Sequence, residues 1–222
     1  MQAMVDPRRV EQADSSAWLA RNPATEGTSV ITSLPDISEL PGLTIAEYTH
    51  WFKARVAQIL EWLPASGVAI FYQSDVKLNG VWLDKSYLVL AAAELTTSAL
   101  LWRKVVCRKP VGTESLGRPG FTHMLALSRT VPRGIRVLGP DVLPSAGTMG
   151  WSRAMGAAAC QVACRYLRAE STTTIVVDPF CGRGDLLAIA ESHGFSSVGI
   201  DISAKRCRAA RSAMLAVAPP LP

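Results

Sequence analysis

Segments with strand character alternate with segments with helix character along almost the whole chain. This alternation is typical of an α/β fold, in which helices connect the mostly parallel strands of one sheet. The sequence predicts strands at 28–34, 67–75, 99–107, 122–128, 174–178 and 196–201. It predicts helices at 44–63, from about Lys85 onward, at 151–167, directly after the turn at 178–184, and at 203–215.

Two of these expectations are specific enough to test. In 44–63 apolar residues recur at steps of three and four, and Thr44 with Glu47 predicts a capping box at the start of an amphipathic helix. Strands 99–107 and 122–128 are joined by a loop alone, so we expect them to pair antiparallel at one edge of the sheet. A linker rich in proline and glycine spans 131–150.

The length of 222 residues, with 49% apolar residues, predicts one core and a single domain over 1–222. The chain has 23 basic and 18 acidic residues, a formal charge of +5. This modest excess suits a polyanionic partner but does not by itself require one.

The cysteines indicate a reducing compartment. They are odd in number and form no C-x-x-C pair, so they predict neither a disulfide framework nor a zinc site. Apolar stretches are interrupted before membrane-spanning length, and the first residues contain no hydrophobic signal core. We therefore expect an intracellular, cytoplasmic protein without a membrane partner. The cysteines are Cys107, Cys160, Cys164, Cys181 and Cys207.

The stretch "TIVVDPFCGRGDLLAIA", 174–190, predicts a strand that passes through a glycine turn into a helix. Such a turn presents backbone N–H groups at the carboxyl edge of the sheet, where open α/β sheets bind ligands. Gly182 and Gly184 allow close approach, and Asp201 ends the next strand, where a carboxylate can accept hydrogen bonds from ribose hydroxyls. Neither G-x-G-x-x-G nor G-K-[ST] is present, so a nucleoside cofactor fits better than a dinucleotide or a nucleoside triphosphate.

The motif "DPFCGRGD" resembles motif I of S-adenosylmethionine-dependent methyltransferases, in the D-P-F-x-G-x-G form of the DNA and RNA amino-methyltransferases. Asp178, Phe180, Gly182 and Gly184 match this motif, and Asp201 falls at the family's ribose-binding acidic position. Asp185 replaces the threonine that is common there. The resemblance implies S-adenosyl-L-methionine as cofactor, a Rossmann-like methyltransferase fold and no metal.

The order of the segments resembles the circularly permuted classes of this family, which place the catalytic strand first and motif I late. "SVITSLPD" resembles their catalytic motif [DNS]-P-P-[YFW], with Ser33 and Pro35 matching the first and third places. Asp14, in "EQADSSAWL", resembles the acidic end of the adenine-side strand. The resemblance thus implies a catalytic half at 10–130, the linker 131–150 and a cofactor-binding half at 151–215.

Asp36 stands where the family has its base-stacking aromatic residue. A carboxylate there can accept a proton or orient a donor group of the acceptor. Asp75 ends another predicted strand at the same edge and is a second catalytic candidate. For both residues, an ordinary loop carboxylate is the simpler alternative.

Further residues are candidates for binding. Arg108 and Arg118 follow predicted strand ends and can contact phosphates. Lys85 begins a helix that points at the predicted cleft, or else is a solvated lysine. His123 lies in a strand, where a packed histidine is the simpler interpretation. Trp151 lies where the permuted enzymes contact the methionine end of the cofactor, or else is a packing anchor. The basic residues of the last predicted helix are most simply a solvated face.

Together these features predict a permuted methyltransferase that acts on nucleic acid. RNA (tRNA or rRNA) is preferred over DNA, because no separate target-recognition domain fits in the chain and a structured RNA can be selected by shape. The alternatives are a methyltransferase for a small molecule or a protein side chain, and an inactive protein that keeps the cofactor fold. The oligomeric state stays open.

Overall fold

The computed structural model describes residues 7–115, 117–130, 139–151 and 154–214. In this part of the chain a sheet has the strand order β1-β10-β9-β2-β3-β7-β6-β8. The first five of these strands run parallel, and β7 is antiparallel to both β3 and β6. The strands are β1 (Arg8–Gln12), β10 (Ser196–Asp201), β9 (Ile175–Asp178), β2 (Thr28–Thr32), β3 (Ala69–Gln73), β7 (Phe121–Ser128), β6 (Ala99–Cys107) and β8 (Val142–Leu143).

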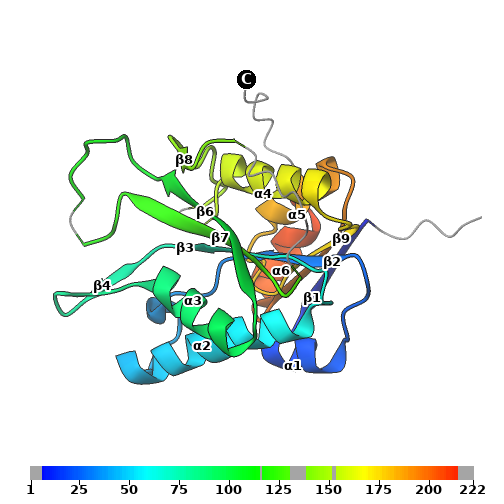
Figure 1. The fold of residues 1–222 in the computed structure, drawn as a ribbon, viewed down its shortest axis with the longest axis horizontal. Helices are drawn as coiled ribbons and strands as arrows, with labels where there is room; N and C mark the ends of the chain where they lie inside the picture. Colours follow the sequence, from blue (N-terminus) through cyan, green and yellow to red (C-terminus); the bar gives the residue numbers. More distant parts are fainter. Residues whose placement is uncertain (1–6, 116, 131–138, 152–153, 215–222) are drawn as a thin grey trace, which may run out of the picture.

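Helices cover both faces of the sheet (Figure 1). One face carries α1 (Ser15–Arg21), α2 (Ile45–Trp62) and α3 (Lys85–Leu95), and the other carries α4 (Ala157–Glu170) and α5 (Asp185–Ser192). Helix α6 (Ala204–Arg211) packs beside α5 near the β1 edge. Successive side chains of β3 point to opposite faces of the sheet and so contribute to both layers. Ile70 packs in the core under α4 and α5, and its neighbour Phe71 packs in the core under α2 and α3.

The mixed α/β sheet predicted from the sequence is confirmed. The capping box of α2 is also present, since Thr44 Oγ1 accepts from Glu47 N and the Glu47 carboxylate accepts from Thr44 N. Strands β6 and β7 pair antiparallel as expected. Circular permutation relative to the family stays a prediction.

The structure corrects the prediction in three places. Helix α4 begins at Ala157, not at Trp151, because Gly156 takes a left-handed φ of +90° and turns the chain directly before it. The predicted linker contains β8, which pairs parallel with β6 at the edge of the sheet; residues 131–138 of that linker lie outside the described residues. The segment after β3 forms a hairpin of β4 (Val76–Leu78) and β5 (Val81–Leu83), where only a loop was expected.

Two global expectations can be compared with the described residues. The five cysteines are free and buried. Within the described ranges, no helix has both the length and the apolar composition needed to cross a membrane.

Candidate active site

Two adjacent pockets lie at the carboxyl ends of the central parallel strands. The first is lined by the turn after β9, the end of β10 and the loop after β2. The second is lined by that same loop after β2, the end of β3 and the connection between β6 and β7. Ser33, Leu34 and Glu39 line both pockets, so the chain after β2 separates them by a thin shared wall.

Asp178 is the last residue of β9 and is buried at the base of the first pocket. Its Oδ1 accepts hydrogen bonds from Thr32 Oγ1 (2.7 Å) and from the Phe180 backbone N–H (3.1 Å). Burial raises the pKa of this carboxyl to about 7, although the two hydrogen bonds lower it and nearby Asp201 raises it further. Asp178 can therefore change its charge near neutral pH.

The turn after Asp178 is held by Asp201. The Gly182 N–H donates to Asp201 Oδ2 (3.1 Å), and the Ser203 N–H donates to Asp201 Oδ1 (2.7 Å). Gly182 has a φ of +55°, and a Cβ there would lie 3.1 Å from the Trp151 ring. The absence of a side chain at Gly182 thus lets the Trp151 indole lie close against the backbone of the turn. Both Gly182 and Asp201 line the first pocket.

Gly184 does not line the first pocket, where the sequence predicts a cofactor contact, but serves the packing of α5 against α6. It is the N-cap of α5, with a φ of +83°, and it is absent from the lining of the first pocket. A Cβ at this position would lie 2.7 Å from Ala210 Cα. Gly184 therefore allows α5 and α6 to pack closely behind the turn.

Asp14, Phe180 and Trp151 also line the first pocket, as the sequence predicts for cofactor-binding residues. Asp14 is the N-cap of α1, and its Oδ1 accepts from Ala17 N (2.9 Å). Asp185 lines the pocket as well, and its Oδ2 accepts from Gly150 N (3.2 Å), next to Trp151. A carboxylate in place of the family's threonine thus fixes the segment that carries the indole.

Arg206 is a pocket residue that the sequence interpretation missed. Its guanidinium lies 5.5 Å from the centre of the Trp151 ring, 3.6 Å from Asp201 Oδ2 and 3.4 Å from Glu39 Oε2. Arg206 therefore spans one side of the first pocket and is not part of a solvated face. The available signal was its place in the first turn of α6, five residues after Asp201.

In the second pocket, Asp36 and Lys85 form an ion pair. Lys85 Nζ lies 3.7 Å from Asp36 Oδ1, and Lys85 is only 3% exposed. Burial lowers the pKa of the Lys85 ammonium, while the carboxylates of Asp36 and Asp75 oppose this effect. Asp36 also caps the short 3-10 helix η1 (Ile37–Glu39) by accepting from Ile37 N (2.8 Å).

Pro35 lies on the other side of the shared wall, in the lining of the first pocket. Its carbonyl accepts a hydrogen bond from the Tyr48 hydroxyl (2.9 Å), which anchors the loop to α2. Ser33 faces both pockets, so the structure brings Ser33, Pro35 and Asp36 to the boundary between them.

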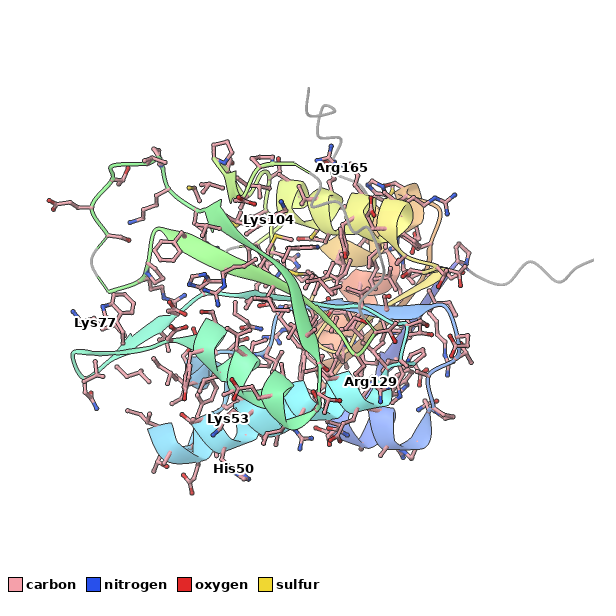
Figure 2. All side chains as sticks on the ribbon, viewed as in Figure 1. His50, Lys53, Lys77, Lys104, Arg129 and Arg165 are labelled. Carbon is pink, nitrogen blue, oxygen red and sulfur yellow. The ribbon has the colours of Figure 1, made fainter. Side chains whose placement is uncertain are left out.

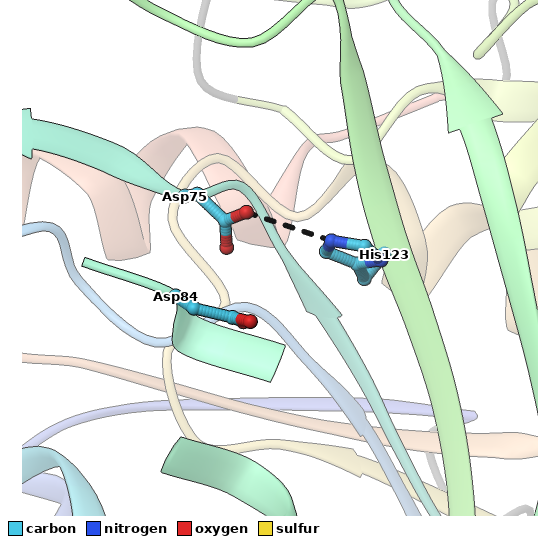
Figure 3. Close-up of side chains that lie close together, drawn as sticks. All are labelled: Asp75, Asp84 and His123. Atoms are coloured by element: carbon cyan, nitrogen blue, oxygen red, sulfur yellow. Dashed lines mark ion pairs between the residues drawn. The ribbon is translucent and has the colours of Figure 1, made fainter. Parts of the chain in front are cut away.

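Asp75 and His123 form a second polar group (Figure 3), and Asp75 connects it to Lys85. Asp75 Oδ1 accepts from the Lys85 backbone N–H (2.9 Å), and Asp75 Oδ2 lies 3.5 Å from His123 Nε2. Asp75 lines the second pocket, whereas His123 is not in its lining and supports Asp75 from β7.

Asp84 lies close to this pair, and ligand atoms of Asp75, Asp84 and His123 lie within 4.8 Å of one another. Such a set of oxygen and nitrogen atoms can bind a cation, which sequence spacing did not indicate. Asp84 Oδ1, however, accepts from Tyr87 N (2.9 Å) and from the Ser86 hydroxyl (2.7 Å). Asp84 thus serves as the N-cap that starts α3 and positions Lys85.

Arg108 and Arg118 lie in the connection between β6 and β7 and line the second pocket. The Arg108 guanidinium donates to Met149 Sδ (3.4 Å), whereas Arg118 is exposed. The structure therefore brings every predicted substrate residue except His123 to the second pocket, namely Lys85, Arg108 and Arg118.

A comparison with protein-family models and one with curated proteins found no match for this sequence. Solved structures match over most of the chain. PvuII DNA methyltransferase, which is cytosine-N4-specific, is 14% identical, with a TM-score of 0.70 over 95% of this chain and 88% of that chain. A second match is a Thermus thermophilus protein that is assigned as a DNA modification methylase and was solved in complex with S-adenosyl-L-methionine. It is 16% identical, with a TM-score of 0.69, and the match covers 91% of this chain and 92% of that chain.

The complex of M1.HpyAVI with S-adenosylmethionine is a further match, 14% identical, with a TM-score of 0.61 over 92% of this chain and 97% of that chain. At these identities the likeness concerns the fold. The chain has the fold of the S-adenosylmethionine-dependent DNA methyltransferases, as the resemblance of its motifs implies. The matched structures give no support to the expected preference for RNA.

Proposed function

We propose that this protein is an S-adenosylmethionine-dependent methyltransferase that acts on nucleic acid. The observation that carries the proposal is the shared wall at Ser33 and Leu34, on whose two sides the pockets lie. A transferase of this kind needs donor and acceptor in line, in separate sites that meet at one point. The first pocket is the proposed donor site and the second the proposed acceptor site.

The side chains of the first pocket suit the chemical groups of the cofactor. Asp14 and Asp201 can accept hydrogen bonds from adenine and ribose, and Phe180 and Trp51 offer aromatic surface. Asp178 can bind a cationic group of the cofactor, because Thr32 and Phe180 both donate to Oδ1 and Oδ2 is left for this contact. When bound, S-adenosylmethionine supplies an electrophilic methyl group on a positively charged sulfur.

The chain's own residues align the acceptor. Ser33 is positioned at the shared wall and offers a hydroxyl and a carbonyl to an acceptor amino group. Asp36 can orient this group or take its proton, and Lys85 fixes the Asp36 carboxylate through their ion pair. Asp75, which binds the amide of Lys85, holds the start of α3 and so supports this arrangement.

Nucleic acid is the proposed acceptor because the connection between β6 and β7 brings the cationic side chains of Arg108, Lys109 and Arg118 into the lining of the second pocket. Within this class we favour DNA over the RNA expected from the sequence, since PvuII DNA methyltransferase and the T. thermophilus methylase are DNA enzymes by name. The division into a catalytic half at 10–130 and a cofactor half at 151–215 of one permuted domain is part of the same proposal.

A second candidate is supported by Asp36 itself. The carboxylate and its lysine partner occupy the place of a stacking aromatic residue, and a charged pair suits a small polar molecule or a protein side chain as acceptor. An inactive protein that keeps the fold without binding the cofactor is the third alternative.

Two binding measurements separate these alternatives. Calorimetry tests whether the protein binds S-adenosylmethionine, and filter binding tests whether it retains DNA, tRNA or rRNA. The proposal predicts both kinds of binding. Cofactor binding without retention of any nucleic acid would favour the small acceptor, and the absence of cofactor binding would overturn the donor site.

A further inference from the structure

We propose that the β4–β5 hairpin, together with Arg108, Lys109 and Arg118 of the connection between β6 and β7, forms a docking surface for duplex DNA beside the second pocket. The inference rests on the proposed function, because it assigns the pocket's acceptor to a DNA strand. It goes further in naming the elements that hold the duplex.

The hairpin projects from the body of the protein (Figure 1). Its turn at Asn79 and Gly80 has φ values of +49° and +84°, as a tight two-residue hairpin turn requires. The ribbon begins directly after Asp75 and ends directly before Asp84 and Lys85. Its base is therefore fixed at the second pocket.

The two faces of the ribbon differ. Val76 pairs with Leu83, and these side chains pack toward the protein core. Lys77 pairs with Trp82 on the opposite face, with Lys77 Nζ 5.8 Å from the centre of the indole ring. Trp82 is 47% exposed, and Figure 2 shows Lys77 on the projecting part of the molecule. A large exposed aromatic residue beside a cation is typical of a nucleic-acid contact.

The opposite side of the pocket mouth is positively charged. The connection 108–120 contains the three cations Arg108, Lys109 and Arg118 and one acid, Glu114, a net charge of 3 − 1 = +2. In the described part of the chain, neither Lys109 nor Arg118 takes part in an ion pair.

The acids within the pocket are already engaged. Asp36 lies against Lys85, and Asp75 lies against His123. Lys109 and Arg118 thus remain available to phosphates, and Lys77 adds a cation from the hairpin side.

The shape of the ribbon favours DNA over double-stranded RNA. The major groove of B-form DNA is about 12 Å wide and admits a two-stranded ribbon, whereas the major groove of A-form RNA is too narrow and deep for side chains to read. We expect Lys77 to contact a phosphate. Trp82 then contacts the base next to the nucleotide that enters the second pocket, because extrusion of a nucleotide exposes the faces of its neighbours.

The test compares two hairpin variants with two controls in the full chain. Lys77→Ala and Trp82→Ala change the proposed surface. Arg165→Ala removes an exposed cation on α4, on the other face of the sheet (Figure 2), and Leu95→Ala removes an exposed apolar side chain at the end of α3. Fluorescence anisotropy then measures the affinity for a labelled DNA duplex and for an RNA duplex of the same sequence at several salt concentrations.

We expect Lys77→Ala to reduce the slope of log affinity against log salt by about one unit for DNA. We expect Trp82→Ala to weaken DNA binding about fivefold to a hundredfold at an unchanged salt slope. Both controls should bind DNA like the parent protein, and RNA binding should not respond to either hairpin variant.

DNA affinities of the hairpin variants equal to the parent's would overturn the docking surface, as would losses matched by the controls or seen equally with RNA. Cofactor binding separates this result from failure of the proposed function. If the parent protein binds S-adenosylmethionine and the hairpin variants bind DNA normally, only the docking surface is wrong. If the parent does not bind S-adenosylmethionine, the proposed function itself fails.

Discussion

The ammonium of Lys85 lies 3.7 Å from the carboxylate of Asp36 in the lining of the second pocket. Ser33 and Leu34 separate this pocket from the first pocket, which contains the Asp178 turn. The two residues come from α3 and from the loop after β2, so the pair depends on the tertiary fold. A buried lysine of this kind is stabilised by its acidic neighbours, and it fixes the orientation of the carboxylate in return.

This pair leads to the first prediction. Asp36→Asn should lower the turnover number on the order of a hundredfold, because an amide cannot take a proton or hold the same charge beside the acceptor. Cofactor affinity should stay nearly unchanged, since asparagine can still cap η1. Steady-state kinetics together with calorimetry check this. Asp36→Tyr, which supplies the family's aromatic residue without the carboxylate, should be equally inactive. If Asp36→Asn turns over at the parent rate, the loop is structural and Asp75 becomes the next candidate.

The second prediction concerns Asp201, whose oxygens accept from Gly182 N and Ser203 N. Asp201→Asn keeps the size of the side chain but loses the charge and one acceptor. Affinity for S-adenosylmethionine should fall by about 1 to 3 kcal/mol, as measured by calorimetry. Asp141→Asn is the matched control, because Asp141 is exposed before β8 and away from the first pocket. Equal affinities for the two variants would argue against the ribose contact.

A pH dependence follows from Asp178, whose pKa burial raises to about 7. The folded state then holds a proton that the unfolded state releases near pH 4, so this group's contribution to the free energy of unfolding declines as pH rises toward 7. Between pH 5 and pH 8 the free energy of unfolding of the parent should therefore fall by about 3 kcal/mol relative to that of Asp178→Asn.

Urea unfolding of both proteins at several pH values measures this difference. Asparagine keeps an oxygen acceptor for Thr32 and Phe180, so the variant isolates the charge of the carboxyl. A stability difference between the two proteins that does not vary with pH would show that Asp178 is ionised throughout.

The fourth prediction tests the packing behind the turn. Gly184→Ala should lower the free energy of unfolding by about 2 to 5 kcal/mol, because it combines a strained φ with a clash against Ala210. Gly194→Ala is the control, since Gly194 has nearly the same φ, +82°, and nothing within 4 Å of an added Cβ. It should cost about 1 to 2 kcal/mol, for the backbone strain alone. Denaturant unfolding of the two variants compares them, and equal losses would exclude the close contact with α6.

The sequence predicts those parts of the fold that depend on local chemistry. Thr44 and Glu47 form their capping box within one helical turn, and the turn at Gly182 follows from the need for a positive φ. The motif alone also predicts that the Asp178 turn and Asp201 lie close together, because adjacent parallel strands end at the same edge of a sheet.

Other features depend on contacts between distant segments and leave little signal in the sequence. Arg206 reaches Trp151 and Glu39 only because α6 returns over the first pocket. The start of α4 is set by Gly156, which lies against Ala146, and a helical periodicity cannot show such a contact. The β4–β5 hairpin is too short for a clear alternation, although its Asn-Gly turn is a signal that the sequence interpretation did not use.

Transfer of a labelled methyl group tests the central claim most directly. The purified protein is incubated with S-adenosylmethionine carrying a deuterated methyl group and with DNA or RNA, and the digested nucleosides are analysed by mass spectrometry. The account predicts a deuterated methyl group on a nucleoside from DNA with the parent protein, and a strongly reduced amount with Asp36→Asn. Unlabelled nucleosides from both DNA and RNA, with a parent protein that binds the cofactor, would contradict it.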